Sequence, residues 1–131
     1  MPQSRNNQLT NKQRKIVFEK GTEPPFSGEW LHNEQAGDYV CINCRATLFS
    51  SQHKFDSKSG WPSFCDVAQY GAVKLQMDSS HGMERVEATC AACDAHLGHV
   101  FDDAVDQPTG KRYCINSLAL DFVKQEEDAD A

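Results

Sequence analysis

The segment Arg112-Tyr113-Cys114-Ile115-Asn116-Ser117 is the one around which we expect the fold to be built. Its polar and apolar residues alternate with the period of a β-strand. Arg112, Cys114 and Asn116 should therefore project from one face of that strand, while the residues between them pack behind it. A thiol between a fixed positive charge and an amide is a candidate nucleophile, because a nearby cation favours the thiolate. The alternative interpretation is a half-buried cysteine on an ordinary strand.

The sequence on both sides of this segment is typical of a mainly β, antiparallel domain. A capping-box pattern, Thr10 followed by Gln13, predicts a short N-terminal helix over residues 11–20. Two prolines in residues 21–28 exclude a longer helix and favour an extended crossing of the core. A loop rich in Ser and Gly is expected at residues 54–64. Alternation and β-branched residues predict strands at residues 39–41, 46–49, 72–76, 84–89, 112–116 and 118–123.

Length and charge limit the classes of function. The chain has 131 residues and a net charge of -6, which indicates one domain, expected over residues 10–123. We expect a flexible tail at residues 1–9 and an acidic, disordered tail at residues 124–131. The acidic balance disfavours nucleic acid as a partner, since a phosphate-binding surface needs clustered Lys and Arg. The N-terminus has no apolar signal core, and no apolar run is long enough to span a bilayer. We therefore expect a soluble, monomeric protein of the cytoplasm, without a membrane partner.

Four of the six cysteines form two pairs with the spacing of a zinc site. In a reducing compartment, such cysteines favour metal binding or redox chemistry over disulfides. Two CxxC turns present four thiolates to a tetrahedral ion and leave no position for an activated water. The long separation of the pairs costs only roughly 0.8 kcal/mol more in loop closure than a loop of about 18 residues, whereas zinc supplies roughly 10–16 kcal/mol. The sequence therefore predicts one structural Zn²⁺ bound by Cys41, Cys44, Cys90 and Cys93.

Other interpretations of the two pairs fit the sequence less well. Two redox dithiols would be expected beside a βαβ pattern, which neither pair shows. A zinc deaminase needs a His-x-Glu and a Pro-Cys-x-x-Cys element, and both are missing. A zinc-dependent hydrolase needs an open metal position, which a set of four thiolates does not provide. A non-catalytic binding module similar to a zinc ribbon stays open, although it leaves the polar face around Cys114 unexplained.

Two further elements contain candidate site residues. Ala95-His96-Leu97-Gly98-His99-Val100-Phe101-Asp102-Asp103 places two histidines beside carboxylates that could orient an imidazole or raise its pKa. Zinc ligation and polar loop histidines are the alternatives here. Trp61 precedes a proline, which restrains it toward an extended conformation and fixes the angle of its ring. From this residue alone, a place in the core is the simpler interpretation.

Taken together, these elements resemble the B-type methionine sulfoxide reductases. The resemblance covers residues 10–123 and includes both Cys pairs. It implies two antiparallel β-sheets, a structural Cys₄ zinc, and reduction of the R epimer of methionine sulfoxide in proteins, with thioredoxin as reductant. The other matching motifs are Gly21-Thr22-Glu23-Pro24-Pro25-Phe26, Gly60-Trp61-Pro62-Ser63-Phe64, Ser80-His81-Gly82-Met83, Gly98-His99-Val100-Phe101 and Arg112-Tyr113-Cys114-Ile115-Asn116-Ser117.

The same resemblance implies roles for individual residues. Cys114 would be the nucleophile, and Trp61 would line the pocket for the substrate methyl group. The remaining implied residues are polar: His96, His99 and Asn116 around the sulfoxide oxygen, with Arg112 and Asp103 as charged supports.

At one position the sequence departs from a common pattern of that family. Many members have a cysteine just before the Gly-Trp-Pro motif, but this chain has Ser59, which forms no disulfide. Cys65 is the only thiol outside the predicted zinc site and Cys114. It is therefore a candidate resolving cysteine for a Cys114 sulfenic acid. The alternative is a buried, inert Cys65, with thioredoxin or another thiol reducing the sulfenic acid directly.

Overall fold

The computed structural model describes residues 9–79 and 84–124. The tails expected at residues 1–9 and 124–131 lie almost wholly outside these ranges, and so does the Ser80-His81-Gly82-Met83 motif. Within the described ranges, no helix is both long and apolar enough to cross a membrane.

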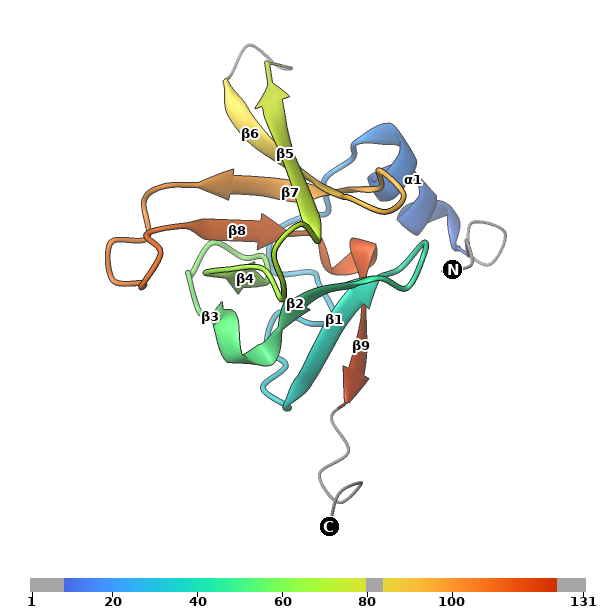
Figure 1. The fold of residues 1–131 in the computed structure, drawn as a ribbon. Coiled ribbons are helices and arrows are strands. Elements are labelled where there is room, and N and C mark those ends of the chain that lie inside the picture. Colours follow the sequence, from blue (N-terminus) through green and yellow to red (C-terminus); the bar gives the residue numbers. More distant parts are fainter. Residues whose placement is uncertain (1–8, 80–83, 125–131) are drawn as a thin grey trace.

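The structure is mainly β and contains two antiparallel sheets and one short α-helix (Figure 1). This confirms the expected fold class. The smaller sheet has the strand order β2-β1-β9, and the larger has the order β3-β4-β8-β7-β6-β5. The elements in chain order are α1 Asn11–Glu19, β1 Gly37–Cys41, β2 Thr47–Ser50, the 3₁₀ turn η1 Ser51–His53, β3 Lys54–Phe55, β4 Ser63–Phe64, β5 Val73–Asp78, β6 Arg85–Cys90, β7 His96–Phe101, β8 Arg112–Ile115, the 3₁₀ turn η3 Ser117–Ala119 and β9 Leu120–Lys124.

Helix α1 begins and ends as its sequence predicts. The Thr10 hydroxyl accepts from the backbone N–H of Gln13 at 3.1 Å, and the Gln13 side chain accepts from the N–H of Thr10 at 2.8 Å. This reciprocal pair satisfies two otherwise orphan donors. Lys20 then adopts a left-handed conformation, with φ of 58°, and ends the helix. The helix is held in place by Ile16 and Val17, which are buried in the core.

Three regions differ from the expectation. Residues 54–64, expected as a loop, contain the two-residue strands β3 and β4, which pair with each other and join β8. Strands this short have no periodicity to detect. Strand β7 was not predicted at all, because a β-bulge interrupts its alternation. The last predicted strand begins later than expected, since residues 117–119 form a 3₁₀ turn before β9.

The bulge in β7 explains how two histidines three residues apart share a face. Glu87 of β6 pairs with His99, but Thr89 pairs with His96, so Leu97 is the extra residue. An extra residue in one strand shifts the alternation of side chains by one position. The rings of His96 and His99 consequently meet edge to face, with centroids 5.5 Å apart.

The register of the larger sheet brings the candidate nucleophile beside one of these histidines. Cys114 on β8 pairs with His99 on β7, and on its other side with Ser63 on β4. Directly opposed residues in antiparallel strands project from the same face. A single row across four strands therefore contains Ser63, Cys114, His99 and Glu87.

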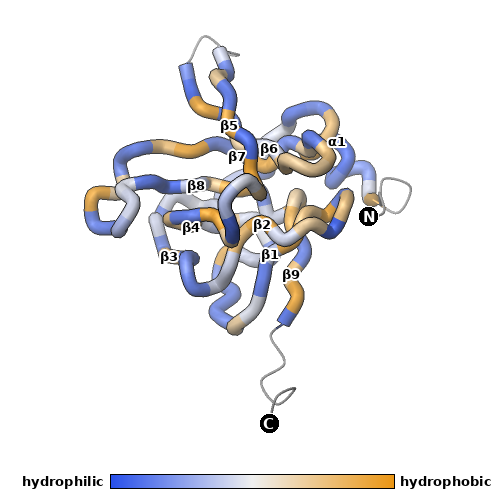
Figure 2. The backbone as a smooth tube through the Cα atoms, in the orientation of Figure 1, coloured by the Kyte–Doolittle hydropathy of each residue, from blue (hydrophilic) through white to orange (hydrophobic). Residues whose placement is uncertain are grey.

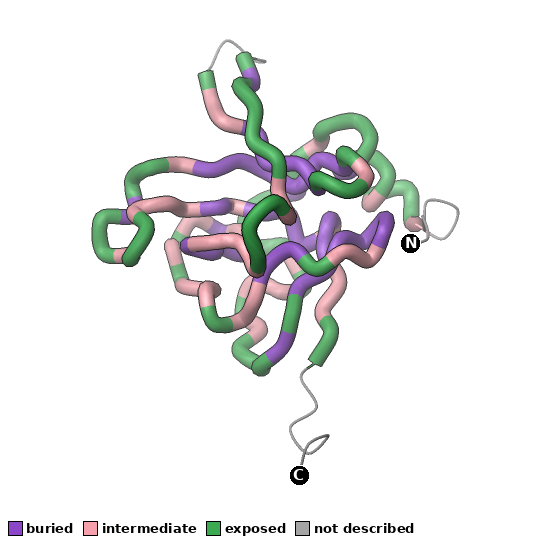
Figure 3. The backbone as a smooth tube through the Cα atoms, viewed as in Figure 1, coloured by how far each residue is buried: buried purple, intermediate pink, exposed green. Residues whose placement is uncertain are grey.

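The core lies between the two sheets and is rich in aromatic rings. Phe49 of β2 stacks on Phe64 of β4 with ring centroids 4.4 Å apart, and Tyr39 of β1 meets Phe64 at 5.1 Å. These contacts hold the small sheet against the strand that neighbours Cys114. Figure 2 shows hydrophobic segments along these strands, and Figure 3 shows that β7 is buried over most of its length.

Gly98→Ala should lower the free energy of unfolding by about 3 kcal/mol, because the structure has no room for a side chain there. A methyl group on Gly98 would overlap the carbonyl oxygen of Cys114 and lie 3.0 Å from the Cα of Ile115. Both are backbone atoms of β8, so the strand itself would have to move. Urea unfolding measures the effect. Gly71→Ala is the control: its methyl group meets nothing within 4 Å, so only the positive φ costs stability, about 1 kcal/mol. Equal losses would contradict the packing argument.

Candidate active site and metal centre

The sulfur of Cys114 lies among hydrogen-bond donors. Nη1 of Arg112 donates to Sγ at 2.8 Å, and the hydroxyl oxygens of Ser59 and Ser63 lie 3.5 and 3.6 Å from it. Ser57 contacts both of these hydroxyls, at 2.7 and 2.6 Å. Cys114 itself is half-buried. A cation and two hydroxyls thus surround one half-buried sulfur.

Arg112 is held against Cys114 by two contacts on its other sides. Nε and Nη2 donate to the two carboxylate oxygens of Asp103 at 2.9 and 2.8 Å. The guanidinium carbon lies 4.5 Å from the ring centroid of Phe101. Hydrogen bonding to Asp103 raises the pKa of Arg112, and the same contact lowers the pKa of the exposed Asp103 carboxyl. The structure thus brings together Cys114, Arg112 and Asp103 as one connected group.

The two histidines bind carboxylates that the sequence analysis did not identify. Nδ1 of His96 lies 2.7 Å from Oε2 of Glu87, and Nε2 of His99 lies 2.8 Å from Oδ2 of Asp78. The expected partners Asp102 and Asp103 pair with cations instead. Asp103 binds Arg112, and Asp102 accepts from Nζ of Lys111 at 3.1 Å. The carboxylates that face the imidazoles therefore come from β6, which pairs with β7, and from β5, the next strand in the sheet.

Trp61 and Asn116 are fixed by the same backbone segment. The indole N–H of Trp61 donates to the carbonyl of Glu23 at 2.9 Å, and the Asn116 side-chain oxygen accepts from the N–H of Glu23 at 3.0 Å. The Asn116 amide group also donates to the carbonyl of Leu97 at 3.0 Å. The expected extended crossing at residues 21–28 therefore positions two site residues. Asn116 is buried, and both ends of its amide bind the backbone rather than the sulfur of Cys114.

A cavity of about 420 Å³ opens beside the Cys114 donors. Ser57, Ser59, Asp103 and Arg112 are among the residues that line it. Arg112 and Ser59 thus border this cavity and also contact Sγ of Cys114, whereas Cys114, the two histidines and Trp61 are not among its lining residues.

Cys65 lies apart from this group. It is buried, its N–H donates to the carbonyl of His53 at 2.9 Å, and its carbonyl accepts from the hydroxyl of Thr109. Burial and the negative charge of Asp66 raise the pKa of the Cys65 thiol. Within the described ranges, no hydrogen bond or disulfide joins Cys65 to Cys114.

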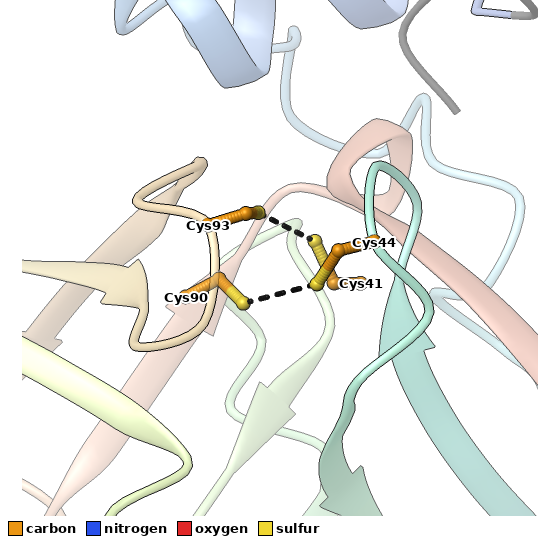
Figure 4. A group of neighbouring side chains, drawn as sticks. All are labelled: Cys41, Cys44, Cys90 and Cys93. Atoms are coloured by element: carbon orange, nitrogen blue, oxygen red, sulfur yellow. Dashed lines mark hydrogen bonds between the residues drawn. The ribbon is translucent and has the colours of Figure 1, made fainter. Parts of the chain in front are cut away.

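The four cysteines of the predicted zinc site come together between the two sheets (Figure 4). Their sulfur atoms all lie within 4.8 Å of one another, and Sγ of Cys41 and Cys44 lie 3.6 Å from Sγ of Cys93 and Cys90, respectively. Each pair sits in the same type of turn, closed by a 2.9 Å bond to the carbonyl of Cys41 and a 2.7 Å bond to that of Cys90.

This geometry fits a tetrahedral metal. Zinc–sulfur bonds of about 2.3 Å give sulfur–sulfur edges of about 3.8 Å in a tetrahedron. Hydrogen bonding to Cys90 and Cys93 raises the pKa of Cys41, while the same shared bonds lower the pKa of Cys93. The protein alone therefore stabilises only part of the negative charge that four thiolates have, and a divalent cation would stabilise the rest. No histidine belongs to this cluster in the described residues.

Sequence reasoning missed four residues of the site: Ser59 and Ser63 at the sulfur, and Asp78 and Glu87 behind the histidines. Ser59 was noted only as a missing cysteine. Glu87 is the charged residue between Val86 and Ala88 in the predicted strand at residues 84–89, yet it is 2% exposed. No local signal distinguishes such a carboxylate, because its burial depends on which strands lie beside it.

Comparison with known proteins gives a consistent result along the chain. Residues 9–124 match the family model of the SelR domain. A peptide methionine sulfoxide reductase MsrB of Chromohalobacter salexigens is 50% identical over 115 residues, 88% of this chain and 86% of the relative. The protein of the same name from Photorhabdus laumondii is 52% identical over 118 residues, 90% and 86% of the two chains. That of Thioalkalivibrio sulfidiphilus is 57% identical over 107 residues, 82% and 77%. The chain belongs to the SelR-domain family, which it shares with these MsrB proteins.

Proposed function

We propose that this protein is a peptide methionine sulfoxide reductase, an oxidoreductase that reduces the R epimer of methionine sulfoxide in proteins. One observation supports this most directly: the sulfur of Cys114 contacts Arg112 at 2.8 Å and lies in the same register row as His99. A nucleophilic sulfur beside a proton donor is what sulfoxide reduction requires. A non-catalytic zinc module would have no use for this arrangement.

The chemistry transfers one oxygen from sulfur to sulfur. The Cys114 thiolate attacks the sulfoxide sulfur while an imidazolium proton goes to the sulfoxide oxygen. The sulfur–oxygen bond of the substrate breaks, and the hydroxyl passes to Cys114. The products are methionine, a Cys114 sulfenic acid and a neutral imidazole. The substrate sulfur gains the two electrons that the cysteine sulfur loses.

The other predicted residues have supporting roles in this proposal. Trp61 borders the substrate methyl group, with its ring held by the Glu23 carbonyl. Arg112, backed by Asp103, faces the sulfur. His99 faces the oxygen as its proton donor, and His96 lies beside His99. Asn116 contributes by fixing the backbone before His99, since it binds Leu97.

The metal proposed for the cysteine cluster is a single structural Zn²⁺. Cys41, Cys44, Cys90 and Cys93 would hold it, and their four sulfurs complete its coordination. When bound, the ion supplies charge neutralisation and a cross-link between the sheets, and it takes no part in the reaction.

A second thiol must reduce the sulfenic acid. We propose that thioredoxin does so, on a monomeric protein in the cytoplasm. Burial and the raised pKa of Cys65 support direct attack by the external thiol, because the thiolate is the attacking species. Mass spectrometry after one turnover without reductant distinguishes the two routes. Persistent sulfenic acid supports direct attack, and a Cys65–Cys114 disulfide would establish Cys65 as the resolving cysteine.

Ser59→Cys should create an internal resolving thiol, because the Ser59 hydroxyl lies 3.5 Å from Sγ of Cys114. After one turnover we expect a disulfide between the introduced thiol and Cys114, and at least tenfold less sulfenic acid available for trapping by dimedone. The mass of the intact protein and the trapped fraction measure this. Ser57→Cys is the control, since Ser57 contacts the other two serines but not the sulfur. Equal trapping in all three proteins would contradict the geometry.

The test of the proposed function is reduction of the two epimers, supplied separately, with dithiothreitol as electron donor. We expect turnover of peptidyl methionine-R-sulfoxide, little turnover of the S epimer, and none by Cys114→Ser. Equal rates on both epimers, or full activity without the Cys114 thiol, would contradict the proposal.

A further inference from the structure

Two buried carboxylates lie directly behind the histidines and have no role in the chemistry above. Asp78 on β5 is 4% exposed and Glu87 on β6 is 2% exposed. Burial of a carboxylate is costly unless charged or hydrogen-bonding partners compensate. Two such groups beside a reaction centre, each bonded to a different imidazole, therefore suggest a specific task.

The carboxylates engage opposite nitrogens of the two rings. Asp78 binds Nε2 of His99 and Glu87 binds Nδ1 of His96, at 2.8 and 2.7 Å. The hydrogen bond at one ring nitrogen determines which nitrogen is left for the substrate. Nδ1 is thus left on His99, and Nε2 is left on His96. Nε2 of His96 is buried and has no hydrogen-bond partner among residues 9–79 and 84–124.

Cations lie on the far side of both carboxylates. Nζ of Lys20, at the end of α1, lies 3.4 Å from Glu87 and 3.7 Å from Asp78, and Arg85 lies 3.8 Å from Asp78. Gln76 donates to the second oxygen of Glu87 at 3.0 Å. Burial by itself raises the pKa of Glu87, but the bonds from Gln76 and His96 and the charge of Lys20 lower it below its ordinary value.

We propose that Asp78 and Glu87 are positioning residues of the reductase step that give the two histidines different tasks. Asp78 supports His99 as the proton donor, and Glu87 holds His96 as a neutral hydrogen-bond acceptor. This inference rests on the proposed function.

The surroundings of the two rings differ in the way this division requires. Burial lowers the pKa of His96, and the hydrogen bond to Glu87 opposes this only in part. His96 is therefore neutral, with its proton on Nδ1 and a lone pair on Nε2. A sulfoxide oxygen is a hydrogen-bond acceptor. Nε2 of a neutral His96 has a lone pair but no proton, so His96 cannot protonate that oxygen.

His99 has the complementary properties. It pairs in register with Cys114, and its side chain is 11% exposed, compared with 2% for His96. The Asp78 carboxylate lies 2.8 Å from Nε2 of His99, so a carboxylate group faces this ring directly. The charged and titratable groups around the pair in the described residues are Lys20, Asp78, Arg85, Glu87 and Cys114.

Asp78→Asn tests the first half of the proposal. The amide oxygen still accepts from Nε2 of His99, so the ring stays in place, but the charge that supports the imidazolium is lost. We expect kcat for the R epimer to fall 10- to 100-fold with KM changed less than about threefold. The pH dependence of kcat should change as well, because the carboxylate beside the proton donor is replaced by a neutral amide.

Glu87→Gln tests the second half. A glutamine side chain offers one oxygen where two donors, Gln76 and His96, each need one. We expect a roughly tenfold loss of kcat without a shift of the pH profile, because His96 stays uncharged throughout. Adding Gln76→Ala removes the competing donor and should restore most of the activity. Gln76→Ala alone is the matched control and should have little effect.

Zinc content and thermal unfolding of each variant show whether it is folded. For the wild-type protein, ¹⁵N spectra of the imidazoles should show His96 neutral with its proton on Nδ1 at pH 7. A charged His96, a proton on its Nε2, an unshifted pH profile in Asp78→Asn, or no rescue by Gln76→Ala would each overturn the inference. If a variant does not fold, the spectra decide. Failure of the wild-type protein to reduce either epimer would instead overturn the proposed function and leave the spectra as the measure of the histidine assignment.

Discussion

Cys44→Ser should unfold the protein in aqueous buffer at 25 °C. Cys44 is 4% exposed, and its sulfur lies 3.6 Å from that of Cys90 on the other sheet. Binding of zinc to a site of this type contributes roughly 10–16 kcal/mol, whereas the whole stability of a domain is about 5–15 kcal/mol. Loss of a large part of the zinc-binding free energy therefore exceeds the free energy of unfolding of the domain.

The position of the cluster explains why the loss would reach the active site. Cys41 ends β1 in the small sheet, and Cys90 ends β6 in the large one. The second turn leads directly into β7, which contains both histidines. Once the cluster opens, the turn that begins β7 loses its link to the small sheet, and only strand pairing holds the bulge that aligns His96 with His99.

Circular dichroism and metal analysis measure this prediction. Cys65→Ser is the matched control, because Cys65 is equally buried but lies outside the cluster. It should retain one zinc per chain and lose only about 1–3 kcal/mol, the cost of burying an unpaired hydroxyl. A cooperatively folded Cys44→Ser protein without metal would contradict a structural role for the ion.

The features that the sequence predicted correctly are local ones. The capping box of α1, the strand alternation near Cys114 and the two CxxC pairs each lie within a few residues, so neighbouring side chains determine them. The partners of the histidines were wrongly predicted because they depend on strand order. Asp102 follows β7 directly, whereas Asp78 comes from β5, and pairing through β6 was not visible in the pattern.

The role of Asn116 illustrates a second limit. Its alternation with Cys114 predicted a side chain on the same face, but the strand ends at Ile115. Beyond that point the amide binds the backbone of Glu23, far away in the sequence. Side-chain alternation holds only inside a strand, so the boundary of an element decides which residues can share its face.

His99→Ala should lower kcat for sulfoxide reduction by about 10²- to 10⁴-fold at saturating thioredoxin, and Arg112→Lys by no more than about tenfold. Expelling oxygen from a sulfoxide requires a proton, and general acid catalysis is worth about 10² to 10⁴. Activation of a thiol is worth less. For any cysteine, a pKa lowered from about 8.5 to about 6.5 increases the thiolate at pH 7 roughly 25-fold, but nucleophilicity falls roughly eightfold.

Arg112→Lys keeps a positive charge near Cys114 while it removes the paired bonds to Asp103 and the contact with Phe101. This variant therefore tests the position of the cation beside Cys114 and leaves the histidines, which supply the proton, unchanged. His96→Ala should also cost more activity than Arg112→Lys, but it leaves the buried Glu87 without its imidazole partner, so its stability must be measured as well. His99→Ala likewise removes the imidazole partner of Asp78, but it is the sharper test, because His99 pairs in register with Cys114 and is more exposed than His96. Equal losses in His99→Ala and Arg112→Lys would show that activation of the sulfur, rather than protonation of the oxygen, limits the reaction.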